Sequence, residues 1–264
     1  AQAVARWAGD ADNGSPSLDY ALADWTPWMS PAGRAGVRLG RVKIPFGLYN
    51  ETRDVAHTRP GIVMPGVYFD TARNLLLSLD GAGAYLERTT RAGDFKLDVV
   101  AGKPRSEELD DLPSISAALT DTDIGGARFA RLLYDSPGGA LTYAAADLEL
   151  TASSEFGALR ADVDVAFFGV SAQWAGAAWQ LTAEHFWRRF ETRLAGMRDT
   201  TWSPGWYAQA SWAPAPRWGL YLRYEASYLD GDDRSGRNAQ AMTGLPRHLA
   251  FQKDWTAGLR YDVT

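Results

Sequence analysis

The sequence predicts an all-β protein, an antiparallel up-and-down β-barrel that crosses a membrane. Three observations lead to this prediction. Many short segments alternate apolar and polar residues, the connections between them alternate between short and long, and one face of the best-defined segments is uncharged with aromatic residues near its ends.

About twelve segments show a period of two residues and are bounded by turn-forming residues. These predicted strands lie near 2–9, 18–27, 34–44, 81–90, 94–103, 124–135, 139–150, 162–174, 178–190, 205–213, 217–230 and 253–264. In two neighbouring strands the charged residues do not share one face, which indicates a bulge or a different register. These charged residues are Arg128, Arg131, Asp147 and Glu149.

The connections between the predicted strands alternate in length along the whole chain. The tight connections lie at Trp28–Gly33, Arg91–Gly93, Ser136–Gly138, Ala175–Ala177 and Pro214–Pro216. The long polar connections lie at 10–17, 45–80, 104–123, 151–161, 191–204 and 231–252. An up-and-down barrel in an outer membrane has short periplasmic turns and long external loops, whereas the Greek-key crossings of a soluble sandwich do not keep such a rhythm.

The segment 217–230 separates an uncharged face from a polar one. The uncharged face holds Trp218, Leu220, Leu222, Tyr224, Ala226 and Tyr228. Arg223 and Glu225 lie on the opposite face, and segments 94–103 and 253–264 repeat the pattern. A soluble antiparallel sheet alternates in the same way. Aromatic residues at the strand ends and strands of about ten residues favour a lipid-facing exterior, with the polar face enclosing a lumen.

The composition excludes several classes of protein. The chain of 264 residues has a net charge of -5, which argues against a nucleic-acid partner. It has no Cys, so disulfides and thiolate metal sites are excluded. No run approaches the roughly 18 apolar residues that a spanning helix needs. A helical membrane protein is therefore excluded. A barrel remains compatible with the sequence, because strands that alternate apolar and polar residues have a low mean hydropathy.

The sequence offers little for metal binding or catalysis. Acidic runs such as Asp230–Asp233 supply oxygen ligands for calcium, but runs of this kind are usually solvated loop tips. The three histidines have no metal-ligand spacing; they are His57, His185 and His248. No nucleophile elbow, phosphate-binding glycine loop or paired zinc histidines occur. We therefore predict no metal, no cofactor and no enzymatic activity.

The stretch 40–70 reads GRVKIPFGLYNETRDVAHTRPGIVMPGVYFD. It resembles the porin family typified by the phosphate-selective outer-membrane porins, in which a strand ending in G-R-x-K-x-P-F-G-x-Y leads into E-T-R-D and T-R-P. The resemblance implies a bacterial outer-membrane barrel of about sixteen strands, commonly a homotrimer, with a loop folded into the pore. Elsewhere the chain resembles this family in strand rhythm alone.

The resemblance implies more strands than this chain supplies. The last segment, Trp255 to Val263, also reads as a strand that stops at a sheet edge, where unpaired backbone groups in lipid would cost several kcal/mol each. We therefore expect one β-barrel domain over residues 1–264, given as a fragment that lacks native N- and C-terminal parts.

The connection 45–80 is the candidate constriction loop of the pore. Its basic residues are Arg53, His57, Arg59 and Arg73. The residues predicted to face the lumen from the barrel wall are Arg38, Lys43, Lys96, Arg223 and Arg260. These side chains form either a basic track that attracts anions or a set of ion pairs that hold the loop in place. Acidic residues outnumber basic ones, 32 to 27, so both interpretations stay open.

We predict an outer-membrane porin that lets small hydrophilic solutes or ions diffuse passively, with anion preference as the finer hypothesis. The expected partners are the lipid bilayer, these solutes and further copies of the chain in a homotrimer. The alternative is a non-conducting outer-membrane barrel with a structural or surface-binding role. A soluble binding module is the third possibility.

Overall fold

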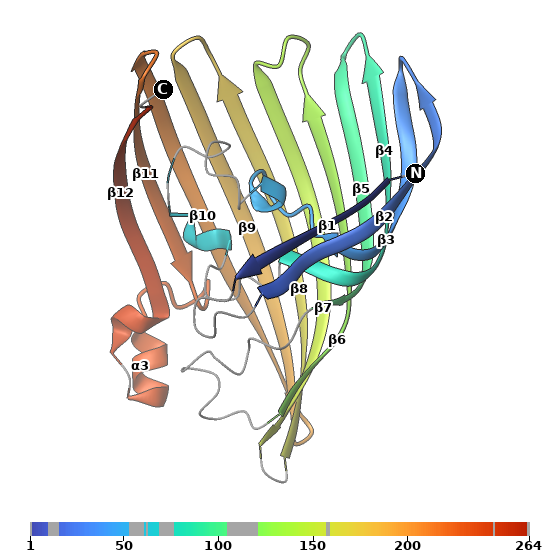
Figure 1. Cartoon of the computed structure of the whole chain (residues 1–264). Helices are drawn as coiled ribbons and strands as arrows, with labels where there is room; N and C mark the ends of the chain where they lie inside the picture. Colours follow the sequence, from blue (N-terminus) through green and yellow to red (C-terminus); the bar gives the residue numbers. More distant parts are fainter. Residues whose placement is uncertain are drawn as a thin grey trace.

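Twelve strands form one continuous sheet in chain order in the computed structural model, which describes residues 2–9, 16–52, 61, 63–68, 77–104, 121–156, 159–244 and 246–262 (Figure 1). Each strand pairs antiparallel with the next, and β1 and β12 are the two edges of this sheet as far as it is described. The strands are β1 Gln2–Gly9, β2 Pro16–Ser30, β3 Gly33–Lys43, β4 Ser78–Thr90, β5 Gly93–Pro104, β6 Asp121–Asp135, β7 Leu141–Phe156, β8 Leu159–Ala175, β9 Trp179–Leu194, β10 Met197–Ala215, β11 Trp218–Tyr228 and β12 Phe251–Tyr261. The predicted antiparallel up-and-down fold is confirmed, with a strand at every predicted position.

The few helical segments lie in the connections. They are η1 Asn50–Thr52, η3 Gly66–Tyr68, α3 Arg237–Thr243 and η5 Arg247–Ala250. Among the residues described, no helix has the length and apolar character needed to cross a membrane.

The tight connections are confirmed, and they lie together at one end of the sheet (Figure 1). Two predicted long connections are wrong. Only residues 157–158 separate β7 from β8, and the hairpin Ala195–Gly196 separates β9 from β10. Both hairpin residues have positive φ, at 51° and 82°, which suits a two-residue turn.

The strands extend past their predicted ends. The ends were predicted too early because charged side chains replace apolar ones along these strands. Arg198 pairs with Glu191 across β9 and β10, and Arg193 pairs with Asp164 across β8 and β9. The outward face of these segments is charged, so the apolar outward face that marks the other strands disappears while the backbone hydrogen bonds persist.

The apolar faces point outward, as predicted. On β5, Leu97 and Val99 are 41% and 44% exposed, whereas Asp98 between them is 1% exposed. On β11, Leu222 is 48% exposed and the adjacent Arg223 is 1% exposed. In a water-soluble sheet this arrangement would be inverted, so the exterior of the curved sheet is suited to hydrocarbon.

Charged residues on both faces explain why β6 and β7 fitted the alternating pattern poorly. The register shifts between Ile124 and Ala127, where Gly125 and Gly126 are inserted. Beyond this bulge Arg131 faces inward at 3% exposure of its side chain, whereas Arg128 faces outward. The two arginines therefore lie on opposite faces of one strand.

The interior of the sheet holds a hydrophobic core around the chain that follows β3. Ile44, Phe46 and Tyr68 from this connection are at most 1% exposed. They pack against inward-facing apolar residues of β6 to β10, among them Phe129, Leu148, Phe167, Phe186 and Tyr207. The inner wall is therefore apolar at this level because it is covered by protein and not by water.

We predict that Leu97→Arg on the outward face destabilises the protein in lipid vesicles, because a charge then faces hydrocarbon. The free energy of unfolding should fall by roughly 2–4 kcal/mol. Denaturant titration into vesicles measures this. The control is Leu249→Arg in η5, which is 55% exposed outside the strands and is expected to have almost no effect. Equal effects at both positions would contradict an exterior that contacts lipid.

Candidate functional site

The candidate site is the inner loop, defined here as residues 44–68, together with the inner wall of β5 to β11 that surrounds it. Figure 1 shows η1 and η3 of this loop in the space enclosed by the curved sheet. The predicted loop folds inward from the end of β3, as the resemblance to porins implies. Residues 44–52, 61 and 63–68 of it are described.

Aromatic contacts fix the start of the loop. The ring of Phe46 stacks on Phe186 at 4.6 Å and meets Phe129 and Phe167 edge-on at 6.4 and 6.2 Å. Gly169 lies opposite Phe186 on the neighbouring strand, and a Cβ there would be 2.3 Å from the Phe186 ring. The glycine therefore lets that ring lie flat on the wall and present its face to Phe46.

A buried carboxylate holds both parts of the loop. Glu184 on β9 is 2% exposed and accepts hydrogen bonds from Leu48 N at 3.0 Å, Ser171 Oγ at 2.6 Å and Tyr207 OH at 2.6 Å. It also accepts one from the Tyr68 hydroxyl. Burial and the nearby Glu184 charge raise the pKa of Tyr68 well above its usual value, so this hydroxyl stays a donor. One carboxylate thus joins η3, the start of the loop and three strands.

A second anchor lies on β11. The Arg223 guanidinium donates from Nη1 to Val63 O at 3.0 Å and from Nη2 to Met64 O at 3.3 Å. Glu225 on the same strand accepts a hydrogen bond from Gly66 N at 2.8 Å, and its carboxylate lies 3.4 Å from Arg223 Nε. Both side chains are therefore satisfied largely by the backbone of the loop.

A third anchor lies on β5 and β6. Arg131 donates to Gly47 O at 3.2 Å, to Asp98 at 2.9 Å and to the carboxylate of Glu51 in η1. Lys96 Nζ lies 3.7 Å from Glu51 and 3.5 Å from Asp98. Burial raises the pKa of Glu51, but the charges of Arg131 and Lys96 lower it by more, so the net shift is downward.

The predicted site residues fall into three groups. Lys96 and Arg223 contact the loop as described above, and Lys43 Nζ donates to Glu51 O at 3.0 Å. Arg38 pairs with Asp24 at 3.1 Å and lies over the ring of Tyr85. The loop residues Arg53, His57, Arg59 and Arg73 lie outside the described residues. Their role in a constriction stays a prediction.

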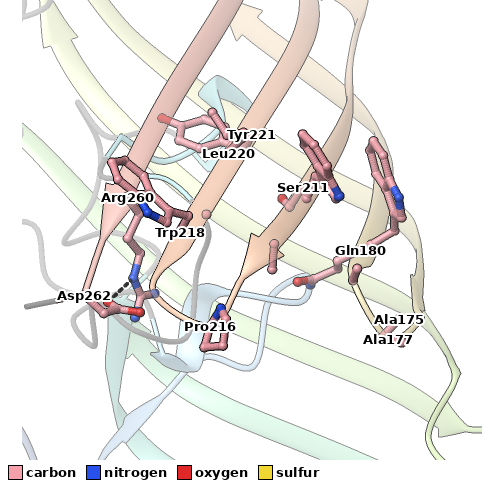
Figure 2. Close-up of a pocket in the computed structure, with 16 residues that line it drawn as sticks. Ala175, Ala177, Gln180, Ser211, Pro216, Trp218, Leu220, Tyr221, Arg260 and Asp262 are labelled. Carbon is pink, nitrogen blue, oxygen red and sulfur yellow. Dashed lines mark hydrogen bonds and ion pairs between the residues drawn. The ribbon is translucent and has the colours of Figure 1, made fainter. Parts of the chain in front are cut away.

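Arg260 lies at the end of the sheet with the short turns. Its Nε donates to Asp262 at 2.8 Å, and both border a hollow of about 380 Å³ that Tyr221 and Ser211 also line (Figure 2). Tyr221 packs so closely on the loop that a Cβ at Gly61 would lie 2.8 Å from its ring. A larger hollow of about 730 Å³ borders Met64 and Glu225 on the side of the long connections.

Sequence reasoning missed Glu184 and gave Arg131 no role. Glu184 shares its strand face with Phe186 and Arg188, opposite Leu181 and Ala183. An acid on the inward side of a lipid-facing strand was the signal that marks it. Among the described residues, no group of three or more His, Asp and Glu is arranged to hold a metal ion.

Residues 139–263 match the family model of phosphate-selective porin O and P. This part of the chain is similar in sequence to that porin family. The predicted resemblance to this family is thus confirmed. The match lies on strands β7 to β12, however, and not on residues 40–70, which carried the prediction. The family match and the apolar exterior indicate that the protein is located in the bacterial outer membrane, as predicted.

Similar folds occur among solved structures. A loop L8 deletion mutant of OmpT, an outer membrane protein of Vibrio cholerae, has 10% identity over 95% of this chain and 81% of its own, with a TM-score of 0.48. The trimer form of in-vitro folded OmpT from Vibrio cholerae has 9% identity over 82% of this chain and 84% of its own, with a TM-score of 0.41. Both similarities are distant. No curated protein matches this chain in sequence.

We predict that Glu184→Ala releases the inner loop, because it leaves several buried donors unpaired at about 1–3 kcal/mol each. Hydrogen exchange of loop peptides in detergent should rise strongly, while Glu184→Gln, which keeps an acceptor, has a smaller effect. Gln180→Ala on the same strand face is the control and should leave exchange unchanged. Unchanged loop exchange in Glu184→Ala would contradict the anchoring role.

We predict that acid weakens the η1 anchor. The folded pKa of Glu51 lies below its ordinary value of 4.5, so its contribution to stability is complete above that value and is lost as the pH falls through the folded pKa. Proteolysis of the loop should therefore stay constant from neutral pH to about pH 5 and rise below pH 4.5. Glu51→Gln should abolish this dependence, whereas Glu87→Gln, which removes the partner of Arg34 on the wall, should keep it.

Proposed function

We propose that this porin forms a passive diffusion pathway for small hydrophilic solutes or ions, and that the inner loop sets its narrowest point. The supporting observation is that the loop is held inside the wall by the buried side chains Glu184, Arg131 and Arg223. A loop that is fixed in this way narrows a channel to a constant width, and width and local charge determine selectivity in a pore.

The finer proposal is a weak preference for anions. The name of the matched family refers to phosphate, yet most basic residues of the described inner wall are engaged with carboxylates or with the loop backbone. Paired cations contribute little to a long-range field. The proposed preference therefore depends on Arg53, Arg59, Arg73 and His57 of the connection 45–80.

Conductance in planar bilayers tests this proposal. We expect stepwise conductance, with a reversal potential that indicates anion preference under a salt gradient. Arg53→Ala combined with Arg59→Ala should reduce that preference. Arg128→Ala on the outward face is the matched control and should not change it. An unchanged ion preference in the double variant would show that the constriction is assigned to the wrong residues.

The alternative function is a non-conducting barrel with a structural or surface-binding role. The observation that favours it is the fully buried apolar cluster between the inner loop and β6 to β10. If the barrel is plugged, the wild-type protein should give no conductance steps, and the Glu184→Ala variant should conduct because its loop is released. A diffusion pore would conduct as wild type.

We also propose that the porin is a homotrimer without cofactor or enzymatic activity. The family resemblance supports this, and one similar structure is described as a trimer form. Gel mobility without heating, together with native mass spectrometry in detergent, distinguishes a trimer from a monomer.

A further inference from the structure

One register row on the outer wall runs across five neighbouring strands and holds three charged residues. Strand pairing places Arg128, Glu149, Ala166, Arg189 and Trp202 side by side across β6 to β10. The row faces away from the lumen, since the side chains of Arg128 and Glu149 are 72% and 44% exposed and Trp202 is 51% exposed. The proposed pore function does not involve these residues.

The row lies just beyond the apolar belt, on the side of the long connections. Phe168 and Trp187 stack at 5.6 Å on the outward face and mark the end of that belt. The next outward positions along these strands are Ala166 and Arg189. Aromatic girdles lie at the level of lipid headgroups, and long loops are external, so the row borders the headgroups of the outer leaflet.

The small side chain of Ala166 leaves a hollow between its larger neighbours. This hollow measures about 490 Å³ and is lined by Arg128, Glu149, Asp164 and Arg189, among others. With neighbouring strands about 4.8 Å apart, the backbones at Arg128 and Arg189 are roughly 14 Å apart across three strand spacings. One headgroup that carries two phosphates can span this distance.

The charges in the hollow favour an anion near Arg189. Arg128 pairs with Glu149, and Arg193 pairs with Asp164, so both lining carboxylates are neutralised. The guanidinium of Arg189 lies 6.0 Å from the ring of Trp202 and has no carboxylate within ion-pair distance among the described residues.

Asp147 is the next outward residue towards the turn from Glu149 and adds a negative charge beside Arg128. Arg189 is therefore the stronger anion ligand of the two arginines. Arginine binds phosphate through two parallel hydrogen bonds, which suits this position.

We propose that this hollow binds the phosphorylated headgroup of an outer-leaflet lipid, with Arg189 as the main phosphate ligand and Arg128 as the second. A lipid is the expected occupant because the hollow opens at membrane level, next to the residues that contact acyl chains. Binding would fix the height of the barrel in the membrane.

Native mass spectrometry of the detergent-solubilised porin with added lipid A tests this proposal. Arg128→Gln combined with Arg189→Gln should bind lipid A about 25-fold more weakly, at about a factor of five per arginine. The control is Arg160→Gln combined with Arg198→Gln, two outward arginines with ion pairs elsewhere on these strands, and it should bind normally. Phosphatidylcholine should bind weakly to every variant.

Ala166→Trp provides a second test, because it fills the hollow without changing a charge. It should weaken lipid A binding as the double variant does, while gel mobility without heating confirms that the barrel is folded. Equal binding of lipid A by wild type and the double variant, or by wild type and Ala166→Trp, would overturn the proposal. Equal binding of lipid A and phosphatidylcholine would also overturn it.

Discussion

Every backbone N–H and C=O group that faces hydrocarbon must be hydrogen-bonded within the protein, because lipid offers no partner. This constraint dictates the sheet in which each of the twelve strands pairs with its chain neighbour. It also places apolar side chains outward and leaves the charged ones, such as Asp98 and Arg223, to point inward. The inner wall then holds charges that need partners of their own. The inner loop supplies many of them.

Backbone groups of the loop and charged groups of the wall satisfy each other. A buried charge is costly unless it is paired or hydrogen-bonded, and a buried loop carries polar backbone groups with the same requirement. Arg223 donates hydrogen bonds to two loop carbonyl groups. Glu225 accepts one from the Gly66 amide, and Glu184 accepts one from the Leu48 amide. The same contacts that allow the loop to be buried therefore also fix its position within the lumen.

The sequence predicted most of the fold because lipid imposes a simple alternation on each strand. Leu97, Asp98 and Val99 follow this rule, and so do Leu222 and Arg223. The rule failed where its physical cause was absent. Beyond the apolar belt, charged residues such as Glu191 and Arg198 occupy the outward positions, so an apolar outward face no longer marks the strand. Where the loop covers the inner wall, that wall becomes apolar.

The candidate site was less predictable because it depends on contacts between distant parts of the chain. The resemblance at residues 40–70 located the loop, and alternation indicated which wall residues face inward. Neither could show that Glu184 would meet both Leu48 and Tyr68, which lie more than a hundred residues away in sequence. Arg131 was ambiguous because Arg128, three residues before it, carries the same charge on the opposite face of the strand.

The role of each arginine follows from the groups that use its donors. Arg223 and Arg131 are buried and donate hydrogen bonds to loop carbonyl groups, and Arg131 also donates to the carboxylate of Asp98. These contacts make both residues structural anchors. Arg189 lies on the opposite surface beside Trp202, where its donors can reach an external phosphate. Counting cations along a porin sequence therefore predicts neither its selectivity nor its lipid contacts. Both depend on which guanidinium groups remain available after the loop and the carboxylates have been satisfied.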